Sequence, residues 1–330
     1  MKARHLICTA PRRIEAADFE LESLPDDGVL VANEFTAVSP GTETYTWIHG
    51  CEPGRQPHYP QNTGYCNAGT VLEAGRGVSN VKPGDRVAGQ GHHASHAVLR
   101  SHYHLVPDNV PSRHAVWLLM GAIALRSVRK SPIELGHAVV VLGLGMVGQL
   151  ASTLARLAGA LPLIAIDPDP VRRDHAHRRG AQITLNPDDV DDLPAAVRTH
   201  CHADGADILI EATGKPEVYP TAVQLICRAG RMIALGSPRG TVTMDFFPQL
   251  HLREITVMGA FQPITPDDDH VYYHWTKQRD RTLILHLMAT GALTVEDLVT
   301  HTARPEACGD IYTMLADRPR ESLGVVFAWE

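Results

Sequence analysis

The stretch VVVLGLGMVG, residues 139–148, constrains the fold of this chain more than any other feature. Four apolar residues precede glycines at positions 143, 145 and 148, and apolar residues then recur at helical spacing through QLASTLARLAG. Between a buried strand and a helix, such glycines permit a tight bend, close approach of the backbone to a ligand, and close contact of helix with strand. The pattern predicts a strand–turn–helix unit whose helix begins beside an anionic ligand.

The residues after this unit alternate between short apolar runs and longer helical patterns. The strand-like runs are PLIAID, ITLN, ADILIEATG, RMIALG and REITVMGAF, while VRRDHAHRRGA, DDLPAAVRTH and VYPTAVQLICRAG have helical character. Strands that alternate with helices form right-handed βαβ units and a parallel sheet covered on both faces. We therefore predict a doubly wound domain over residues 120–264.

The two ends of the chain have a different pattern. Up to about Pro111, short β-type segments such as GDRVAG and HAVLRSHYHLVP are broken by Gly and Pro. After Phe261 come a loop, a helix around residues 281–290 and a last strand in SLGVVFAW. At 330 residues the chain has room for two domains. We predict an α/β protein whose β-rich domain, residues 1–119 and 265–330, holds the doubly wound domain as an insertion and regains the last strand.

Composition argues against several classes of partner. A formal net charge of −7 and a pI near 6.2 disfavour nucleic acid or an anionic membrane as the main partner. No apolar run has the length of a transmembrane segment, and the first residues lack the apolar core of a signal peptide, so we expect a cytoplasmic protein. The six scattered cysteines include no C-x-x-C pair and are expected as free thiols.

An acid follows the glycine turn at the spacing of a dinucleotide site. Asp167 ends the second predicted strand, 19 residues after Gly148. Its carboxylate can accept hydrogen bonds from ribose hydroxyls and repels a 2′-phosphate, which favours NAD over NADP. Arg172 and Arg173 could instead accept a phosphate, and a glycine-rich core turn without a ligand is the alternative. The predicted cofactor-binding residues are Gly143, Gly145, Met146, Val147, Gly148, Asp167, Arg172, Thr213, Gly236, Ser237, Ala260 and Phe261.

Nearly the whole chain resembles the medium-chain dehydrogenase/reductases, the superfamily of zinc alcohol and polyol dehydrogenases. The resemblance rests on GTVLEAGRGVSNVKPGDRV, on the glycine fingerprint with its strands, and on the closing TGAL, LVTH and SLGVVFAW. It implies a GroES-like β-rich catalytic domain, a Rossmann NAD-binding domain, and hydride transfer in the cleft between them.

The same resemblance draws attention to the zinc ligands. In zinc-dependent members the first ligand is the Cys of a C-G-[ST]-D motif, and the matching segment here reads Pro40-Gly41-Thr42-Glu43. The second ligand is the His of a G-H-E motif, which reads Gly64-Tyr65-Cys66 here, and LLMGAIAL holds no third ligand. Because catalytic zinc needs three N, S or O ligands, we expect a zinc-free member with no metal.

Without zinc, a side chain must supply or accept the proton beside the reacting oxygen. Tyr65 takes the place of the ligand histidine, and Thr42 and Tyr45 match the family's proton relay. A phenol acts as an acid–base group only if its neighbours lower its pKa or bind its anion. Tyr65 is otherwise a packing residue, Thr42 a local cap and Cys66 a small apolar residue. The candidate catalytic residues are Tyr65, Thr42, Tyr45, Glu43 and His93.

His93 belongs to a histidine cluster in GHHASHAVLRSHYHL. Together with His92 and His96 it could hold a metal outside the family pattern, or act alone as a general base. The spacing is loose, which favours a solvated or packed role for the cluster.

Aromatic and amphipathic residues on expected loops suggest a substrate with several hydroxyl groups. Such rings pack against sugars and cyclitols, although they also pin loops to a domain. The candidates are Trp47, His49, Tyr272, His274 and Trp275, of which Trp47, His49 and Trp275 are the predicted substrate-binding set.

The sequence therefore predicts an NAD-dependent, zinc-independent oxidoreductase that interconverts a secondary alcohol and its ketone. Reduction of a C=C bond or a quinone with NAD(P)H is the enzymatic alternative, and a non-catalytic NAD-binding protein is the alternative from another class. The expected partner is a small-molecule substrate. A homodimer or homotetramer is also expected, formed through the apolar REITVMGAF strand.

Overall fold

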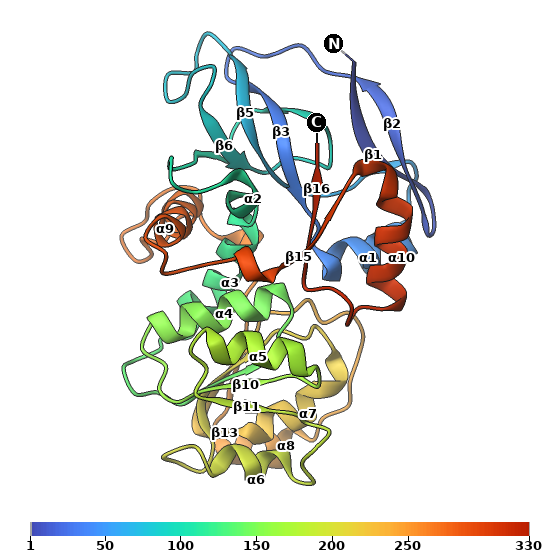
Figure 1. Ribbon diagram of the computed structural model, residues 1–330. Coiled ribbons are helices and arrows are strands. Elements are labelled where there is room, and N and C mark those ends of the chain that lie inside the picture. Colours follow the sequence, from blue (N-terminus) through green and yellow to red (C-terminus); the bar gives the residue numbers. More distant parts are fainter. Residues whose placement is uncertain (1, 330) are drawn as a thin grey trace. The chain divides into compact units, whose positions relative to one another are not determined.

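The computed structural model describes residues 2–329, and the chain divides into two compact units (Figure 1). The terminal unit combines Met1–Met120 with Asp267–Glu330, and the central unit is Gly121–Pro266. Each unit has its own sheets and its own hydrophobic core.

The main sheet of the terminal unit has seven strands. Six follow the order β15-β16-β3-β5-β6-β8, and β7 pairs with β3. The C-terminal strand β16 runs antiparallel to β3, with Val326 opposite Ala37 (Figure 1). The strands are β3 (Val29–Ala37), β5 (Cys66–Ala74), β6 (Arg86–Gly89), β7 (His96–Leu99), β8 (Tyr103–Leu105), β15 (Val299–Ala303) and β16 (Gly324–Ala328).

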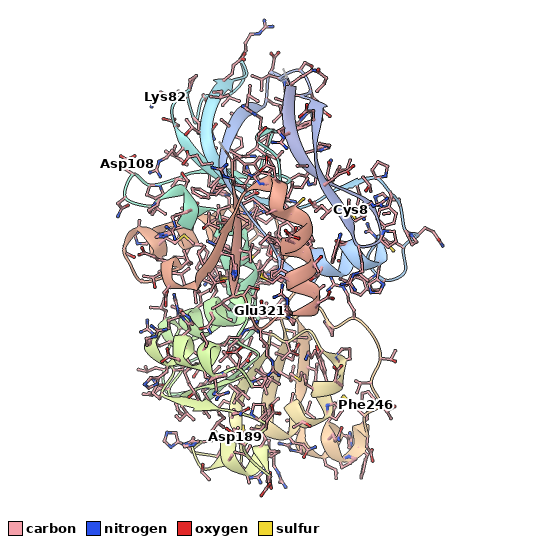
Figure 2. All side chains as sticks on the ribbon, turned by 45° about the vertical axis from the view of Figure 1, so that its right-hand side comes forward. Cys8, Lys82, Asp108, Asp189, Phe246 and Glu321 are labelled. Atoms are coloured by element: carbon pink, nitrogen blue, oxygen red, sulfur yellow. The ribbon has the colours of Figure 1, made fainter. Side chains whose placement is uncertain are left out.

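A smaller sheet and two helices complete one side of this unit. The small sheet has the order β2-β1-β4, and α1 packs beside α10 (Figure 1). Apolar side chains from these elements and from β16 form one core, which includes Leu6, Tyr312, Phe327 and the buried thiol of Cys8 (Figure 2). The elements are β1 (Lys2–Ala10), β2 (Arg13–Glu20), α1 (Pro40–His49), β4 (Gln61–Asn62) and α10 (Cys308–Asp317).

Two further helices cover the main sheet. The short α2 packs on β3, β5 and β6, and α9 packs against α2. The sequence predicted a helix around residues 281–290, and the observed helix begins four residues earlier, capped by the Thr276 side chain. The helices are α2 (Ser112–Ala115) and α9 (Lys277–Ala289), while α3 (Leu118–Lys130) begins in the terminal unit and continues into the central one.

The central unit is a doubly wound parallel sheet. Its strand order is β11-β10-β9-β12-β13-β14, and every pairing is parallel. Strands β9 and β10 are buried along their whole length because helices cover both faces. The elements are β9 (Val139–Leu142), α4 (Met146–Leu157), β10 (Leu163–Ile166), α5 (Pro170–Arg178), β11 (Ile183–Leu185), α6 (Leu193–Arg198), β12 (Ala206–Glu211), α7 (Tyr219–Ala222), β13 (Ile226–Ala234), α8 (Phe246–Gln249) and β14 (Thr256–Gly259).

One element of the central unit differs from the prediction. The segment VYPTAVQLICRAG was expected as a helix, yet α7 ends at Ala222, a 3-10 turn covers Val223–Leu225, and β13 begins at Ile226. Val223, Leu225 and Ile226 are all fully buried, so their apolar character reflects burial on several sides rather than one helical face.

Between residues 2 and 329, no helix is both long and apolar enough to cross a bilayer. The six cysteines are free thiols.

Candidate active site

The glycine turn has the geometry of a dinucleotide loop. Gly143 has a φ of +92°, and a Cβ at Gly148 would lie 2.0 Å from the carbonyl oxygen of Gly143. A Cβ at Gly145 would meet no atom of the chain within 4 Å. The first and third glycines are thus required by the backbone itself, while the second leaves room for a ligand at the start of α4.

Asp167 is held against this turn. Its Oδ2 accepts a hydrogen bond of 2.8 Å from the Leu144 N–H, and its Oδ1 accepts one of 2.8 Å from the Asp169 N–H. Arg173 donates to the Asp167 carbonyl oxygen at 2.6 Å. The carboxylate at the end of β10 therefore lies beside the glycine turn with its direction set by backbone donors, as recognition of a ribose requires.

Glu211 is a residue that sequence reasoning missed. It ends β12, is fully buried, and its Oε1 accepts hydrogen bonds from the Thr213 N–H at 2.6 Å, the Gly214 N–H at 3.0 Å and the Thr213 hydroxyl. Burial raises the pKa of this carboxyl group, against the effect of these donors. The sequence signal that could have identified Glu211 is an acidic residue at the end of the apolar run ADILIE. Glu211 shapes the turn that carries Thr213.

The other predicted cofactor-binding residues lie at the starts of helices and after the ends of strands, and they differ in how exposed they are to solvent. Met146 and Val147 open α4, and Arg172 lies in the first turn of α5, where its N–H donates to Asp169 Oδ1. Gly236 must be glycine, because a Cβ there would lie 2.3 Å from the Gly214 nitrogen. The remaining three follow strand ends: Ser237 is exposed, Ala260 is buried, and Phe261 is 60% exposed.

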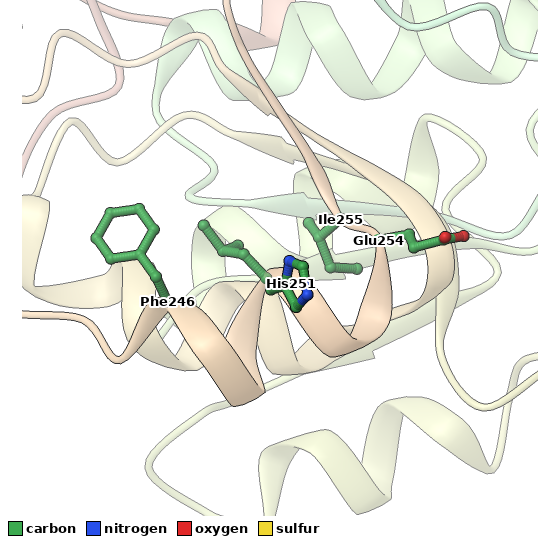
Figure 3. A pocket seen from close by; sticks show the side chains of 5 residues that line it. Phe246, His251, Glu254 and Ile255 are labelled. Carbon is green, nitrogen blue, oxygen red and sulfur yellow. The ribbon is translucent and has the colours of Figure 1, made fainter.

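An open hollow in the central unit lies outside the predicted set. Figure 3 shows it beside α8 and the start of β14, where its lining includes apolar side chains and an imidazole. No convergent set of polar groups marks it as a site for chemistry. Its lining residues are Phe246, Leu250, His251, Glu254 and Ile255.

In the terminal unit, Tyr65 lies at the N-terminal end of α1. The Tyr65 hydroxyl donates a 2.6 Å hydrogen bond to Ser39 Oγ, the residue that precedes the helix, and Thr42 also interacts with the phenol. Burial raises the pKa of Tyr65 well above its ordinary value; Cys66 and Glu43 raise it further, while the two hydroxyls oppose the shift. The environment therefore keeps Tyr65 a neutral phenol. The lowered pKa that a general base requires is not found.

Glu43 is the centre of a buried network. Its Oε1 accepts a 2.7 Å hydrogen bond from the Ser39 N–H, and its Oε2 lies 2.9 Å from His93 Nε2 and accepts a bond from the Tyr312 hydroxyl. Because a carboxylate can only accept, His93 is the Nε2–H tautomer. Every partner is buried, so the network ties α1 to α10 and to the segment before β7. Its position favours a structural role for Glu43 and His93 over direct contact with substrate.

The predicted histidine cluster does not converge. His93 is fully buried, with its ring edge against Phe327; His92 is exposed and bonds Gly64 O, and His96 bonds Ser95 Oγ. Over residues 2–329, no group of three or more His, Cys, Asp or Glu side chains is arranged to hold a metal ion. The packed role for His93 fits its surroundings better than that of a general base.

Two predicted substrate contacts lie elsewhere than expected. Trp47 and His49 are in α1 rather than in a loop, and Trp47 is 2% exposed, packed in the core against Tyr312 and under the Arg12 guanidinium. The indole therefore packs in the core of the terminal unit, and contact of Trp47 with substrate stays a prediction that this packing does not favour. The Tyr45 and His49 rings have centroids 4.4 Å apart and are tilted by 41° to each other. By contrast, Tyr272, His274 and Trp275 lie exposed before α9.

Known proteins share this architecture. A family model described as zinc-binding dehydrogenase matches residues 146–268. The chain is 26% identical over 353 residues to D-guloside 3-dehydrogenase of Escherichia coli (strain K12), covering 98% of this chain and 100% of that protein. It is 27% identical over 288 residues to L-threonine 3-dehydrogenase of Pyrococcus furiosus, covering 78% of each. A solved oxidoreductase/dehydrogenase of unknown specificity from Escherichia coli superposes with a TM-score of 0.89 at 20% identity and covers 100% of both chains.

The parallel sheet with its glycine turn and the β-rich terminal unit form the fold of the medium-chain, zinc-type dehydrogenases, and the chain is similar to members of that superfamily. It is accordingly an enzyme, a dehydrogenase that acts on CH–OH groups with a nicotinamide cofactor.

The residues at the family's zinc-ligand positions do not fit a zinc ion. Pro40 opens α1 and has no donor atom, and the Tyr65 hydroxyl is bonded to Ser39. Burial raises the pKa of the Cys66 thiol well above its ordinary value, so the thiolate that zinc prefers is disfavoured. The nearby Glu43 carboxylate is already engaged by three donors. One neutral thiol does not make the three-ligand set of a catalytic site.

Proposed function

We propose that this protein is an NAD(H)-dependent, zinc-independent dehydrogenase that interconverts a secondary alcohol, on a sugar, cyclitol or similar polyol, and its ketone. One combination of features carries the proposal. Asp167 accepts a hydrogen bond from the glycine turn, and Pro40 and Tyr65 stand where zinc-dependent relatives have metal ligands. The acid favours NAD over NADP, and the replaced ligands favour proton transfer by a side chain over activation by a metal.

When bound, the nicotinamide supplies hydride to the carbonyl carbon or takes it from the alcohol carbon. In the reducing direction Tyr65 donates its phenolic proton to the substrate oxygen. The Ser39 and Thr42 hydroxyls then stabilise the phenolate by hydrogen bonds, and a proton from solvent restores the phenol before the next turnover. In the oxidising direction the same groups accept the proton. Because burial raises the pKa of Tyr65, the phenol is protonated at neutral pH, which is the state that reduction of a ketone requires, although the same shift makes it a weaker acid.

The substrate class has two supports. The similar Escherichia coli protein acts on a D-guloside, a sugar derivative, and the exposed Tyr272 and Trp275 offer rings against which a polyol can pack.

The test combines metal content, chelation and a matched pair of variants. We expect substoichiometric zinc by elemental mass spectrometry and full activity on ketoses after treatment with a chelator. Tyr65→Phe should lower kcat by about a hundredfold or more, because it removes the proton donor. Tyr103→Phe, which removes a phenol whose hydroxyl donates to Asn80 at the surface, should retain activity. One tightly held zinc per chain, with activity that is lost on its removal, would overturn the proposal.

We also propose a homodimer formed through β14. This strand is the last of the sheet, so one of its edges has no partner strand among residues 2–329. Val257 on β14 is 45% exposed, and Phe246, Phe247 and Leu252 nearby are between 57% and 68% exposed. Antiparallel pairing of two β14 strands would satisfy the free edge and cover this apolar surface.

A further inference from the structure

Arg281 is a buried cation with little compensation. It lies in α9 and is 2% exposed, yet its one hydrogen bond is a long contact of 3.4 Å from Nη1 to the His102 carbonyl oxygen. Its buried Nε has no partner within residues 2–329, and no acidic side chain there forms an ion pair with it. A guanidinium removed from water without an anion costs several kcal/mol, on the order of the penalty for any unpaired buried charge.

The other two cations at the start of α9 show the contrast. Lys277 bonds Asp267 at 3.0 Å, and Arg279 pairs with Asp269 at 3.1 Å, both with partly or fully exposed acids. Asp267 is the acid that Arg281 feels most, but its carboxylate is already taken by Lys277. The helix therefore neutralises its outward cations and leaves the inward one uncompensated.

The contact with the His102 carbonyl oxygen places the Arg281 guanidinium beside the start of β8, which belongs to the main sheet. Ala68 on β5 is opposite Ala88 on β6, and Ala88 is opposite His104 on β8, so these three side chains share one face. Cys66 stands two residues before Ala68 and shares that face. The side chains of Ala68 and Ala88 are single methyl groups and occupy little of this face. The positive charge of Arg281 acts on both His104 and Cys66.

His104 supplies a second nitrogen with no partner. It is 5% exposed, and its Nε2 is buried without a hydrogen bond among the described residues. Burial, with Arg281 and His102 nearby, lowers the pKa of His104 to about 4, so the ring is neutral at physiological pH and can donate one N–H. Cys66 does not offset the charge of Arg281, because its thiol is neutral.

We propose that Arg281 and His104 form a subsite for an anionic group, a carboxylate or a phosphate, carried by the substrate. The planar guanidinium presents parallel N–H donors that match two oxygens of such a group, and the imidazole adds a third. Cys66 directly follows Tyr65 in the chain, which places the subsite next to the candidate proton donor. The assignment to the substrate rests on the proposed function; the binding of an anion does not.

The experiment measures anion binding by the protein without cofactor, through thermal unfolding and titration calorimetry. The probes are inorganic phosphate and gluconate, with sorbitol as the neutral comparison for gluconate. For the wild type we expect phosphate or gluconate to raise the midpoint of unfolding while sorbitol has no effect. The anion that binds more tightly identifies the group as phosphate or carboxylate.

Arg281→Met should weaken anion binding at least about tenfold and abolish the shift in midpoint, since a bond to a charged group contributes about 1.5–3 kcal/mol. The matched control is Arg279→Met, which removes an exposed, paired arginine of the same helix and should behave like the wild type. Arg281→Lys keeps the charge without the planar fork and should bind with intermediate affinity, which preserves the test if the Met variant does not fold.

Three results would overturn the proposal. The first is an anion-dependent shift that is the same in Arg281→Met and in the wild type. The second is no binding of either anion by the wild type. The third is loss of phosphate binding when NADH is saturating, which would assign the cation to the phosphates of the cofactor. Failure of the proposed function differs from all three, because a protein without dehydrogenase activity would still bind the anion through Arg281.

Discussion

Replacement of His104 by Gln should remove a large part of the acid sensitivity of the terminal unit. The imidazole is 5% exposed in β8, and its pKa falls from 6.5 to about 4. Burial is the main cause, followed by the positive charge of Arg281 and by His102, which are the charged and titratable neighbours that act on the ring.

The direction follows from proton linkage. Between 6.5 and about 4 the unfolded chain binds a proton at His104 that the folded protein does not bind. Lower pH therefore favours the unfolded state. The penalty is absent above the unfolded pKa, grows as the pH falls through 6.5, and stops growing below the folded pKa. A shift of about 2.5 pKa units corresponds to roughly 3 kcal/mol of unfolding free energy.

The assay is urea denaturation of wild type and His104→Gln over a range from about pH 7.5 to about pH 4.5. Burial also lowers the pKa of His5, His96, His102 and His114, but these residues are present in both proteins and cancel in the difference. The free-energy curves should diverge by about 2–3 kcal/mol across this range. His92→Gln, a change at an exposed histidine, is the control. Curves that stay parallel would refute the reasoning.

Three further predictions concern other parts of the chain. Gly64→Ala should destabilise the protein by more than the roughly 1–2 kcal/mol that a left-handed backbone costs a residue with a Cβ, because that Cβ would lie 2.6 Å from the His93 ring. The control is Gly54→Ala, which has a similar positive φ but open space around it. In urea denaturation it should show only the backbone cost. Asp167→Ser should lower kcat/KM for NADH about tenfold to a hundredfold and improve it for NADPH, and steady-state kinetics that leave the ratio unchanged would contradict the role given to the carboxylate. Val257→Arg should convert a dimer to a monomer in light scattering, whereas a monomeric wild type would contradict pairing through β14.

Local signals predicted the central unit well because they report on short-range physics. An apolar run that ends in glycines can hardly form anything other than a strand and a tight turn before α4, and Asp167 follows from the length of one helix and one strand. The prediction failed at residues 223–230, where apolar residues buried on several sides mimic one helical face. The absence of the family's zinc ligands could likewise be read directly from Pro40 and Tyr65.

The sequence by itself determined the alternation of strands and helices in most of the central unit, the glycine turn with its acid, and the residue types at the ligand positions, because each depends on neighbours along the chain. Only the tertiary structure decided the environment of each side chain. It buried Trp47 in the core, engaged Glu43 with His93 and Tyr312, raised the pKa of Tyr65, and set Arg281 near His104 and Cys66 without a counter-ion. Burial and pairing join residues from distant segments, and no local pattern carries that information.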